Sequence, residues 1–134
     1  MELKEESKVG RLKVDHERIY AFLSDCNNFR QFAVGEKVKN WQANGDSCRF
    51  TIDGAGDVAF RIVERRPGEL LKFSIENAQA ENIFLWVQLK SIQPGDTRVK
   101  LTAKLEVNPV LRMFISKPLK QGLDKIVETL EGIS

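Results

Sequence analysis

Residues 48–62 read CRFTIDGAGDVAFRI, and this stretch decides the fold. On either side of its glycine-rich centre, apolar residues alternate with polar ones, which predicts two half-buried antiparallel strands joined by a turn. The same period of two continues through the chain from Val38 to Val107. Residues that favour turns divide the runs, at Asn44-Gly45-Asp46, Arg66-Pro67-Gly68-Glu69 and Pro94-Gly95-Asp96. The pattern predicts a curved antiparallel sheet of about six to seven strands.

A strand and two short helices are predicted at the start of the chain. Leu3 to Val14 has the alternation of a strand, and Asp15 offers a side-chain acceptor for the free amides of a helix that extends to Ser24. Phe29, Phe32 and Ala33 then predict a second short helical segment.

One long amphipathic helix is predicted to close the chain, from about Asn108 to Glu131. Asn108 suits the N-cap, and Pro109 suits the first helical position because the amide there has no partner. Pro118 and Gly122 are unfavourable inside it, since an internal proline costs about 3 kcal/mol. Either Pro118 separates two helices, or it bends one helix along the sheet while Gly122 lets a strand or a ligand approach; we favour the bend. The fold class expected is α+β, with this helix in the concave face of the sheet.

The composition is that of a globular protein and argues against several functional classes. The 134 residues, 42% of them hydrophobic, predict a single domain over residues 1–134. The formal charge of +2 comes without a concentrated basic block, so nucleic acid is not an expected partner. No run approaches the ~20 apolar residues of an integral membrane segment. The polar N-terminus and two reduced cysteines predict a cytoplasmic protein.

No pattern of residues points to catalysis, a metal or a cofactor. His16 is the single histidine, and it directly follows the predicted helix cap, where side chains are usually solvated. Cys48 has no base near it in the sequence, so we interpret it as a buried, unreactive thiol, whereas Cys26 is expected to be more exposed. We assign no catalytic residue, no metal site, no cofactor and no disulfide.

Several short segments, taken together, resemble the START-like superfamily. They are the helix opened by Val14-Asp15 and ended by Phe22-Leu23-Ser24-Asp25, the turn Pro94-Gly95-Asp96-Thr97-Arg98-Val99, and the closing pieces Asn108-Pro109, Lys117-Pro118-Leu119 and Leu130-Glu131. The stretch from Trp41 to Ile52 is similar to small uncharacterised bacterial members. The superfamily includes pollen allergens of the Bet v 1 type, polyketide cyclase-like proteins and lipid-transfer domains. The resemblance covers essentially the whole chain and implies the helix-grip fold, a curved sheet wrapped around a long C-terminal helix.

The resemblance also implies a cavity for a small hydrophobic or amphipathic ligand between the sheet and the helix. The sheet positions that would line it are Phe50, Ile52, Phe60, Ile62, Phe73, Ile75, Val87, Leu89, Leu101 and Ala103. The helix positions that would line it are Leu111, Ile115, Leu119 and Leu123. The alternative is that all these side chains fill the core. Polar candidates at the rim are limited to Asn77, Asn82 and Gln88.

Phe84 and Trp86 interrupt the alternation, because large apolar residues fall on both faces of their strand. Three interpretations stay open: an exposed patch for a partner or a second copy, a bulge that turns Trp86 into the cavity, or cover by side chains of adjacent strands. Three functions follow from these alternatives. We rank binding of a small apolar molecule first, then a protein-interaction or chaperone-cofactor-like module that uses Phe84 and Trp86 and forms a homodimer, then a polyketide cyclase-like enzyme.

Overall fold

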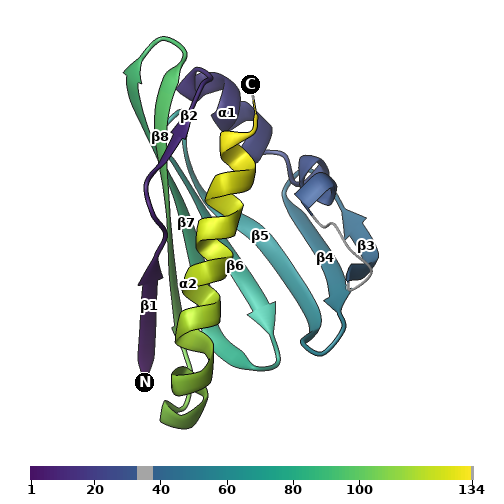
Figure 1. The fold of residues 1–134 in the computed structure, drawn as a ribbon. Helices are drawn as coiled ribbons and strands as arrows, with labels where there is room; N and C mark the ends of the chain where they lie inside the picture. The colour runs from purple at the N-terminus through teal and green to yellow at the C-terminus, as the bar shows by residue number, and fades with distance from the viewer. Residues whose placement is uncertain (33–37, 134) are drawn as a thin grey trace.

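The chain forms an open antiparallel sheet with one long helix across its inner face (Figure 1). The computed structural model describes residues 1–32 and 38–133. The elements, in chain order, are β1 (Glu2–Glu6), β2 (Gly10–Leu12), α1 (His16–Leu23), the 3-10 helix η1 (Cys26–Phe32), β3 (Val38–Ala43), β4 (Ser47–Ile52), β5 (Gly56–Arg66), β6 (Leu70–Asn77), β7 (Ala80–Gln93), β8 (Asp96–Glu106) and α2 (Pro109–Glu131). The strand order is β1-β8-β7-β6-β5-β4-β3, with β2 also paired to β8. The predicted α+β class and helix-grip arrangement are confirmed.

The predicted alternation positions the inner face of the sheet. In β8, Val99, Leu101 and Ala103 are buried, whereas Lys100 and Lys104 are only partly covered. Because successive side chains of a strand point to opposite faces, the buried set faces α2 and the lysines face outward. The turn before β4 forms as predicted, although Asn44 contributes through its side chain: its Oδ1 accepts hydrogen bonds from the backbone amides of Asp46 and Ser47.

The predicted strand from Leu3 to Val14 is divided into β1 and β2, so the sheet has eight strands rather than six or seven. Ser7 lies at the division and is 6% exposed. Its Oγ accepts a hydrogen bond from the Leu101 amide at 2.8 Å, and its own amide donates to the Leu101 carbonyl oxygen at 2.8 Å. The hydroxyl of Ser7 therefore satisfies a buried amide of β8 where the edge strand is interrupted.

Replacing Ser7 by alanine is expected to lower the free energy of unfolding by about 1–3 kcal/mol, because the Leu101 amide loses its acceptor in a buried place. Urea unfolding followed by circular dichroism measures the effect. Ser91→Ala is the control, since Ser91 is exposed on β7. Equal stability of the two variants would show that the Ser7 hydroxyl does not matter.

The predicted side-chain cap at Asp15 is wrong. The Asp15 carboxylate makes no capping hydrogen bond to α1, and its Oδ1 accepts one from the Gly95 amide in the turn between β7 and β8. The Asp15 carboxylate, which the local sequence pattern assigned to the amides of α1, therefore binds a residue far along the chain instead. The second predicted helical segment is η1, and Ala33, which was predicted to extend it, lies outside the described residues.

The terminal helix α2 continues through Pro118 without a break, so the alternative of two separate helices is wrong. Asn108 caps it as predicted, with Oδ1 accepting a hydrogen bond from the Leu111 amide at 2.7 Å. No strand in the described parts of the chain approaches Gly122, because a Cβ built there would meet nothing within 4 Å. No helix in the described parts of the chain is both long and apolar enough to cross a membrane.

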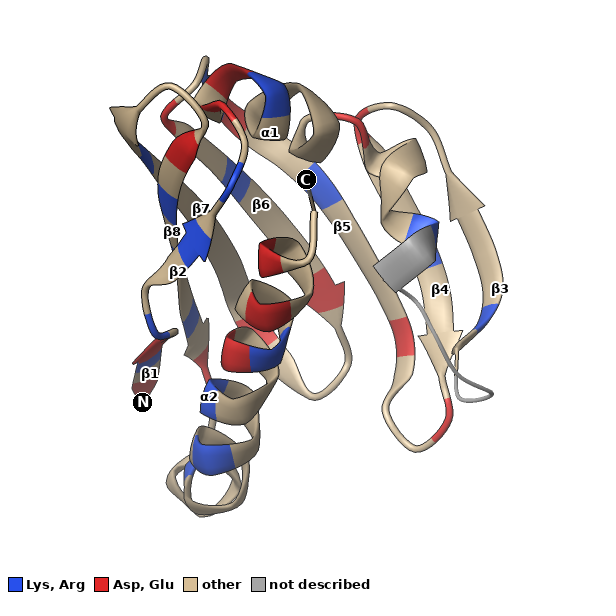
Figure 2. Cartoon of the chain, turned by 45° about the horizontal axis from the view of Figure 1, so that its top comes forward, with Lys and Arg blue, Asp and Glu red and all other residues tan. Residues whose placement is uncertain are grey.

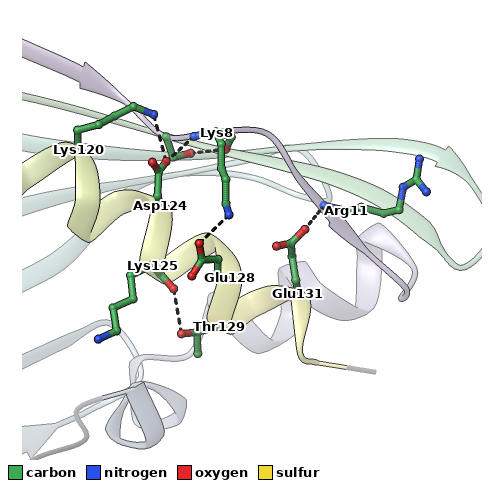
Figure 3. A network of polar contacts seen from close by, with 9 residues as sticks. Lys8, Arg11, Lys120, Asp124, Lys125, Glu128, Thr129 and Glu131 are labelled. Carbon is green, nitrogen blue, oxygen red and sulfur yellow. Dashed lines mark hydrogen bonds and ion pairs between the residues drawn. The ribbon is translucent and has the colours of Figure 1, made fainter.

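The helix α2 lies over one side of the sheet, against β1, β2 and β8. Its first half covers a small cluster of Leu3, Leu105 and Val107, and its second half covers the main core. A polar network holds the second half in place: the Lys8 amide donates to Asp124 at 2.6 Å, Lys8 Nζ pairs with Glu128 at 2.7 Å, and the Arg11 amide donates to Glu131 at 2.9 Å (Figure 3). The helix α2 therefore does not cover the inner surface of the strands farther from β8.

Candidate functional site

An open pocket of about 400 Å³ lies between the inner face of the sheet and the C-terminal end of α2. Its volume is in the range of small-molecule sites, about 300–1,000 Å³. Among the described residues, the side chains that line it are all apolar: Leu23, Phe29, Val38, Trp41, Phe50, Ile52, Phe60, Phe73, Ile75, Leu85, Val87, Leu101, Ile126 and Leu130. Both short helical segments and the sheet contribute, so the pocket depends on the whole fold.

Aromatic rings form one wall of this pocket. Trp41 stacks on Phe50 with ring centroids 5.3 Å apart, and Phe60 meets Phe50 edge-on at 5.4 Å. The ring centroid of Phe73 lies 6.3 Å from that of Phe60. The Phe29 ring packs on both, with centroids 6.2 Å from Phe60 and 5.8 Å from Phe73. Offset and edge-to-face packing at these distances is favourable and holds the rings in place. The wall is consequently a firm apolar surface that suits a flat or hydrocarbon ligand.

A second hollow, of about 460 Å³, lies over β4, β5 and β6 and differs in character. Its lining includes Arg49, Arg61 and Glu76, which alternate along their strands with the apolar residues of the first pocket. These side chains are exposed, so water already solvates the polar groups there. The apolar pocket is therefore the better candidate for a ligand site.

No family model matches this sequence, and no curated protein matches it either. Solved structures do match. Norcoclaurine synthase from Thalictrum flavum, in complex with dopamine and hydroxybenzaldehyde, is 13% identical over 100% of this chain and 90% of that chain, with a TM-score of 0.69. A START superfamily protein from Mycobacterium smegmatis is 14% identical over 98% and 94%, with a TM-score of 0.73. An Aha1 dimer from Colwellia psychrerythraea is 14% identical over 97% of each chain, with a TM-score of 0.67.

The chain has the Bet v 1/START-like fold. Within this fold, the sheet positions predicted for the cavity fall into two groups. Those that line the pocket are Phe50, Ile52, Phe60, Phe73, Ile75, Val87 and Leu101. Ile62, Leu89 and Ala103 are 6%, 8% and 5% exposed and pack in the core beside the pocket. The alternation therefore identified the correct face of the sheet without separating the cavity wall from the core.

The predicted contribution of α2 to the pocket is displaced along the helix. Leu111 and Ile115 pack on the small cluster under the first half of α2, Leu119 packs on both this cluster and the main core, and Leu123 is buried in the main core. Ile126 and Leu130 line the pocket instead. The correction has a geometric cause: α2 in this START-like chain packs against β1, β2 and β8, and only its C-terminal end borders the pocket.

Other lining residues were missed for different reasons. Leu85 has the same parity as Val87 on β7, and Ile126 follows the apolar stripe of α2, so the sequence pattern contained a signal for both. Leu23 and Phe29 reach the pocket because α1 and η1 fold back over the sheet. No local pattern indicates that placement.

The polar residues predicted at the rim are engaged elsewhere. Asn77 Nδ2 donates to the carbonyl oxygens of Ala55 and Asp57, at 3.0 Å each, and braces the neighbouring hairpin. Asn82 donates to Glu106 at 2.9 Å. Gln88 is exposed and accepts a hydrogen bond from Thr102 at 3.1 Å. None of the three lines the pocket.

His16 and the two cysteines have structural surroundings. His16 Nδ1 lies 3.1 Å from the Gly68 carbonyl oxygen, which can only accept, so Nδ1 carries the proton of this bond. Cys26 is 0% exposed, which corrects the expectation of an exposed thiol, and Cys48 is 3% exposed. Both thiols are free, and the neighbouring Cys26 thiol together with burial raises the pKa of Cys48. Among the described residues, no group of side chains is arranged to hold a metal ion.

Phe84 and Trp86 lie on the outer face of β7, so the interpretation that a bulge turns Trp86 into the cavity is wrong. Trp86 pairs with Thr102 in the regular register, and neither ring lines the pocket. Lys72 Nζ lies 4.5 Å from the Phe84 ring centroid and 5.1 Å from that of Trp86, and Lys104 Nζ lies 5.9 Å from the latter. Side chains of the adjacent strands thus cover both rings in part, through cation–π contacts.

Proposed function

We propose that this protein binds a small hydrophobic or amphipathic molecule in the apolar pocket. The observation that carries the proposal is an open pocket of about 400 Å³ whose described lining is apolar throughout. Burial of apolar ligand surface there is favourable by about 25 cal/mol per Å². Because the pocket opens to solvent, a ligand with an apolar body and one polar end fits it as well as a pure hydrocarbon does.

The aromatic wall narrows the class of ligand. Trp41, Phe50, Phe60 and Phe73 present rings at stacking and edge-on geometry, which favours aromatic or conjugated molecules. A solved structure with this fold, norcoclaurine synthase, holds dopamine and hydroxybenzaldehyde. Small aromatic compounds are therefore the first molecules to test.

Two other functions have weaker support. Cyclase-like chemistry requires a titratable group in contact with the ligand, and the described lining supplies only apolar side chains. An interaction module centred on Phe84 and Trp86 draws support from the dimer formed by one protein with this fold. The lysines over both rings reduce the apolar surface that such a contact needs.

The position of Trp41 in the pocket wall allows a direct test. The neutral apolar fluorophore N-phenyl-1-naphthylamine is expected to quench Trp41 emission as it binds, because the indole is part of the lining. The chain contains two tryptophans, so Trp86→Phe isolates the pocket signal and Trp41→Phe removes it. Native mass spectrometry of freshly purified protein would identify a ligand carried from the cell.

Quenching that persists in Trp41→Phe and disappears in Trp86→Phe would place the fluorophore on the outer face and contradict the proposal. The proposal would also be contradicted if folded wild-type protein showed no change in tryptophan emission and no change in the fluorescence of N-phenyl-1-naphthylamine when the two are mixed. Circular dichroism of each variant verifies that the sheet is intact.

A further inference from the structure

The first two turns of α2 expose large apolar side chains that the fold does not use. Val110 is 65% exposed, Met113 82% and Phe114 71%. Spacings of three and four residues place them on one face of the helix, beside the face of Leu111 and Ile115, which pack on the small cluster. Large apolar residues that gather on one exposed face usually mark a contact surface.

The charges along α2 run against the helix dipole. Residues 108–123 contain Arg112, Lys117 and Lys120 and neither Asp nor Glu, whereas residues 124–131 contain three acidic residues, Asp124, Glu128 and Glu131, and one basic residue, Lys125. A helix N-terminus carries partial positive charge, so basic side chains near it are mildly unfavourable. Figure 2 shows the basic positions on the early turns of α2 and the acidic ones farther along.

Contacts within the fold explain the acidic half of α2. Asp124, Glu128 and Glu131 bind the segment that contains Lys8 and Arg11 (Figure 3). Contacts within the fold do not explain the basic half to the same degree. Lys120 pairs with Asp124 at 3.1 Å, but Arg112 and Lys117 have no ion pair among the described residues.

The apolar and basic side chains together indicate what covers this face. The early turns of α2 project beyond the end of β1, at one extremity of the molecule in both views (Figures 1 and 2). A stable dimer buries about 800 Å² on each partner, a larger area than three exposed apolar side chains on two helical turns can cover. An anionic bilayer surface requires only shallow insertion of apolar groups beside cations that reach the lipid phosphates.

We propose that the first turns of α2 dock this protein on the surface of an anionic lipid bilayer. Val110, Met113 and Phe114 enter the headgroup region, and Arg112 and Lys117 contact lipid phosphates. The helix lies against the membrane and stays packed on the sheet through Leu111 and Ile115. This docking does not depend on the ligand proposed for the pocket.

Co-sedimentation with vesicles tests the docking face. The protein is expected to pellet with vesicles of phosphatidylcholine and phosphatidylglycerol, and to bind them less at high salt, which screens charge. Met113→Ser/Phe114→Ser is expected to abolish pelleting. Each of Arg112→Gln and Lys117→Gln is expected to weaken partitioning about fivefold, in proportion to the lipid attraction of one charge. Vesicles of phosphatidylcholine alone are expected to bind far less protein.

Matched controls make the result specific to this face. Val63→Ser/Ile92→Ser removes apolar side chains that are 45% and 49% exposed elsewhere, and Lys125→Gln removes a charge from the acidic half. Both variants are expected to pellet like the wild type.

Several outcomes would overturn the inference. They are absence of wild-type binding to anionic vesicles, equal loss in the control variants, or a wild-type dimer that Met113→Ser/Phe114→Ser converts to a monomer without vesicle binding. Trp41 quenching by N-phenyl-1-naphthylamine, measured on the same protein variants without vesicles, separates the two proposals. Intact quenching with failed vesicle binding removes only the docking face, and the reverse removes only the pocket ligand.

Discussion

Replacing Gly10 by alanine is expected to destabilise the protein by about 2 kcal/mol, within the range of overpacked cores. The usual expectation is the opposite, because a glycine in ordinary backbone geometry gains about 0.4–1 kcal/mol from alanine through the unfolded state. Gly10 is not among the glycines with positive φ. The contact between β2 and α2 therefore decides whether alanine at position 10 stabilises or destabilises the protein.

Space at Gly10 is taken by two valines. A Cβ there would overlap Val127 Cγ1 and come within 3.1 Å of Val99 Cγ1. Val127 is 0% exposed and Val99 1%, so neither can move toward solvent. A β-branched side chain is also restricted at χ1, which leaves Val127 few ways to turn aside. Alanine at position 10 must push α2 away from β2.

A double-mutant cycle with Val127→Ala measures this contact. Val127→Ala alone leaves a cavity and destabilises, and adding Gly10→Ala to it is expected to cost about 1–3 kcal/mol less than adding it to the wild type. Gly122→Ala is the matched control on α2, where a Cβ meets open space and alanine is expected to stabilise by about 1 kcal/mol. Urea unfolding gives all values. Wild-type stability of Gly10→Ala would disprove the close approach.

Replacing Leu85 by tryptophan is expected to weaken binding of N-phenyl-1-naphthylamine at least about tenfold, a loss of 1.4 kcal/mol or more. Leu85 lines the pocket from the middle of β7, where it pairs with Phe73 on β6 and Ala103 on β8. It is only half-buried, so a larger ring has room on the pocket side. The indole would occupy the volume that the proposed ligand needs.

The emission of the bound fluorophore is the measurement, because the new tryptophan complicates protein fluorescence. Ile92→Trp is the control: it adds the same ring to β7 at a side chain that is 49% exposed and outside the pocket. Ile75→Trp, on β6, repeats the test from a second strand. Unchanged affinity in both folded pocket variants would show that the fluorophore binds elsewhere.

The chain's local patterns determined most of the elements and one wall of the pocket. The alternation through Phe50, Phe60 and Phe73 depends only on the two-residue period of a strand, and the structure has all three on the aromatic wall. Asn108 and Pro109 begin α2 as predicted, because a cap is a contact over a few residues. Asp15 shows the limit of such reasoning, since Gly95, far along the chain, takes its carboxylate.

The sequence by itself therefore determined the strands from β3 to β8, the terminal helix and the face of the sheet that turns inward. Only the tertiary structure decided where α2 crosses that face. Leu111 and Ile126 lie on the same apolar side of α2, yet one packs on the small cluster and the other lines the pocket. The position of α2 across the sheet depends on its close approach to β2 at Gly10 and on the hydrogen bond from the Lys8 amide to Asp124, two residues that lie 116 positions apart. Periodicity records which way a side chain points, whereas contacts between distant residues decide what it meets.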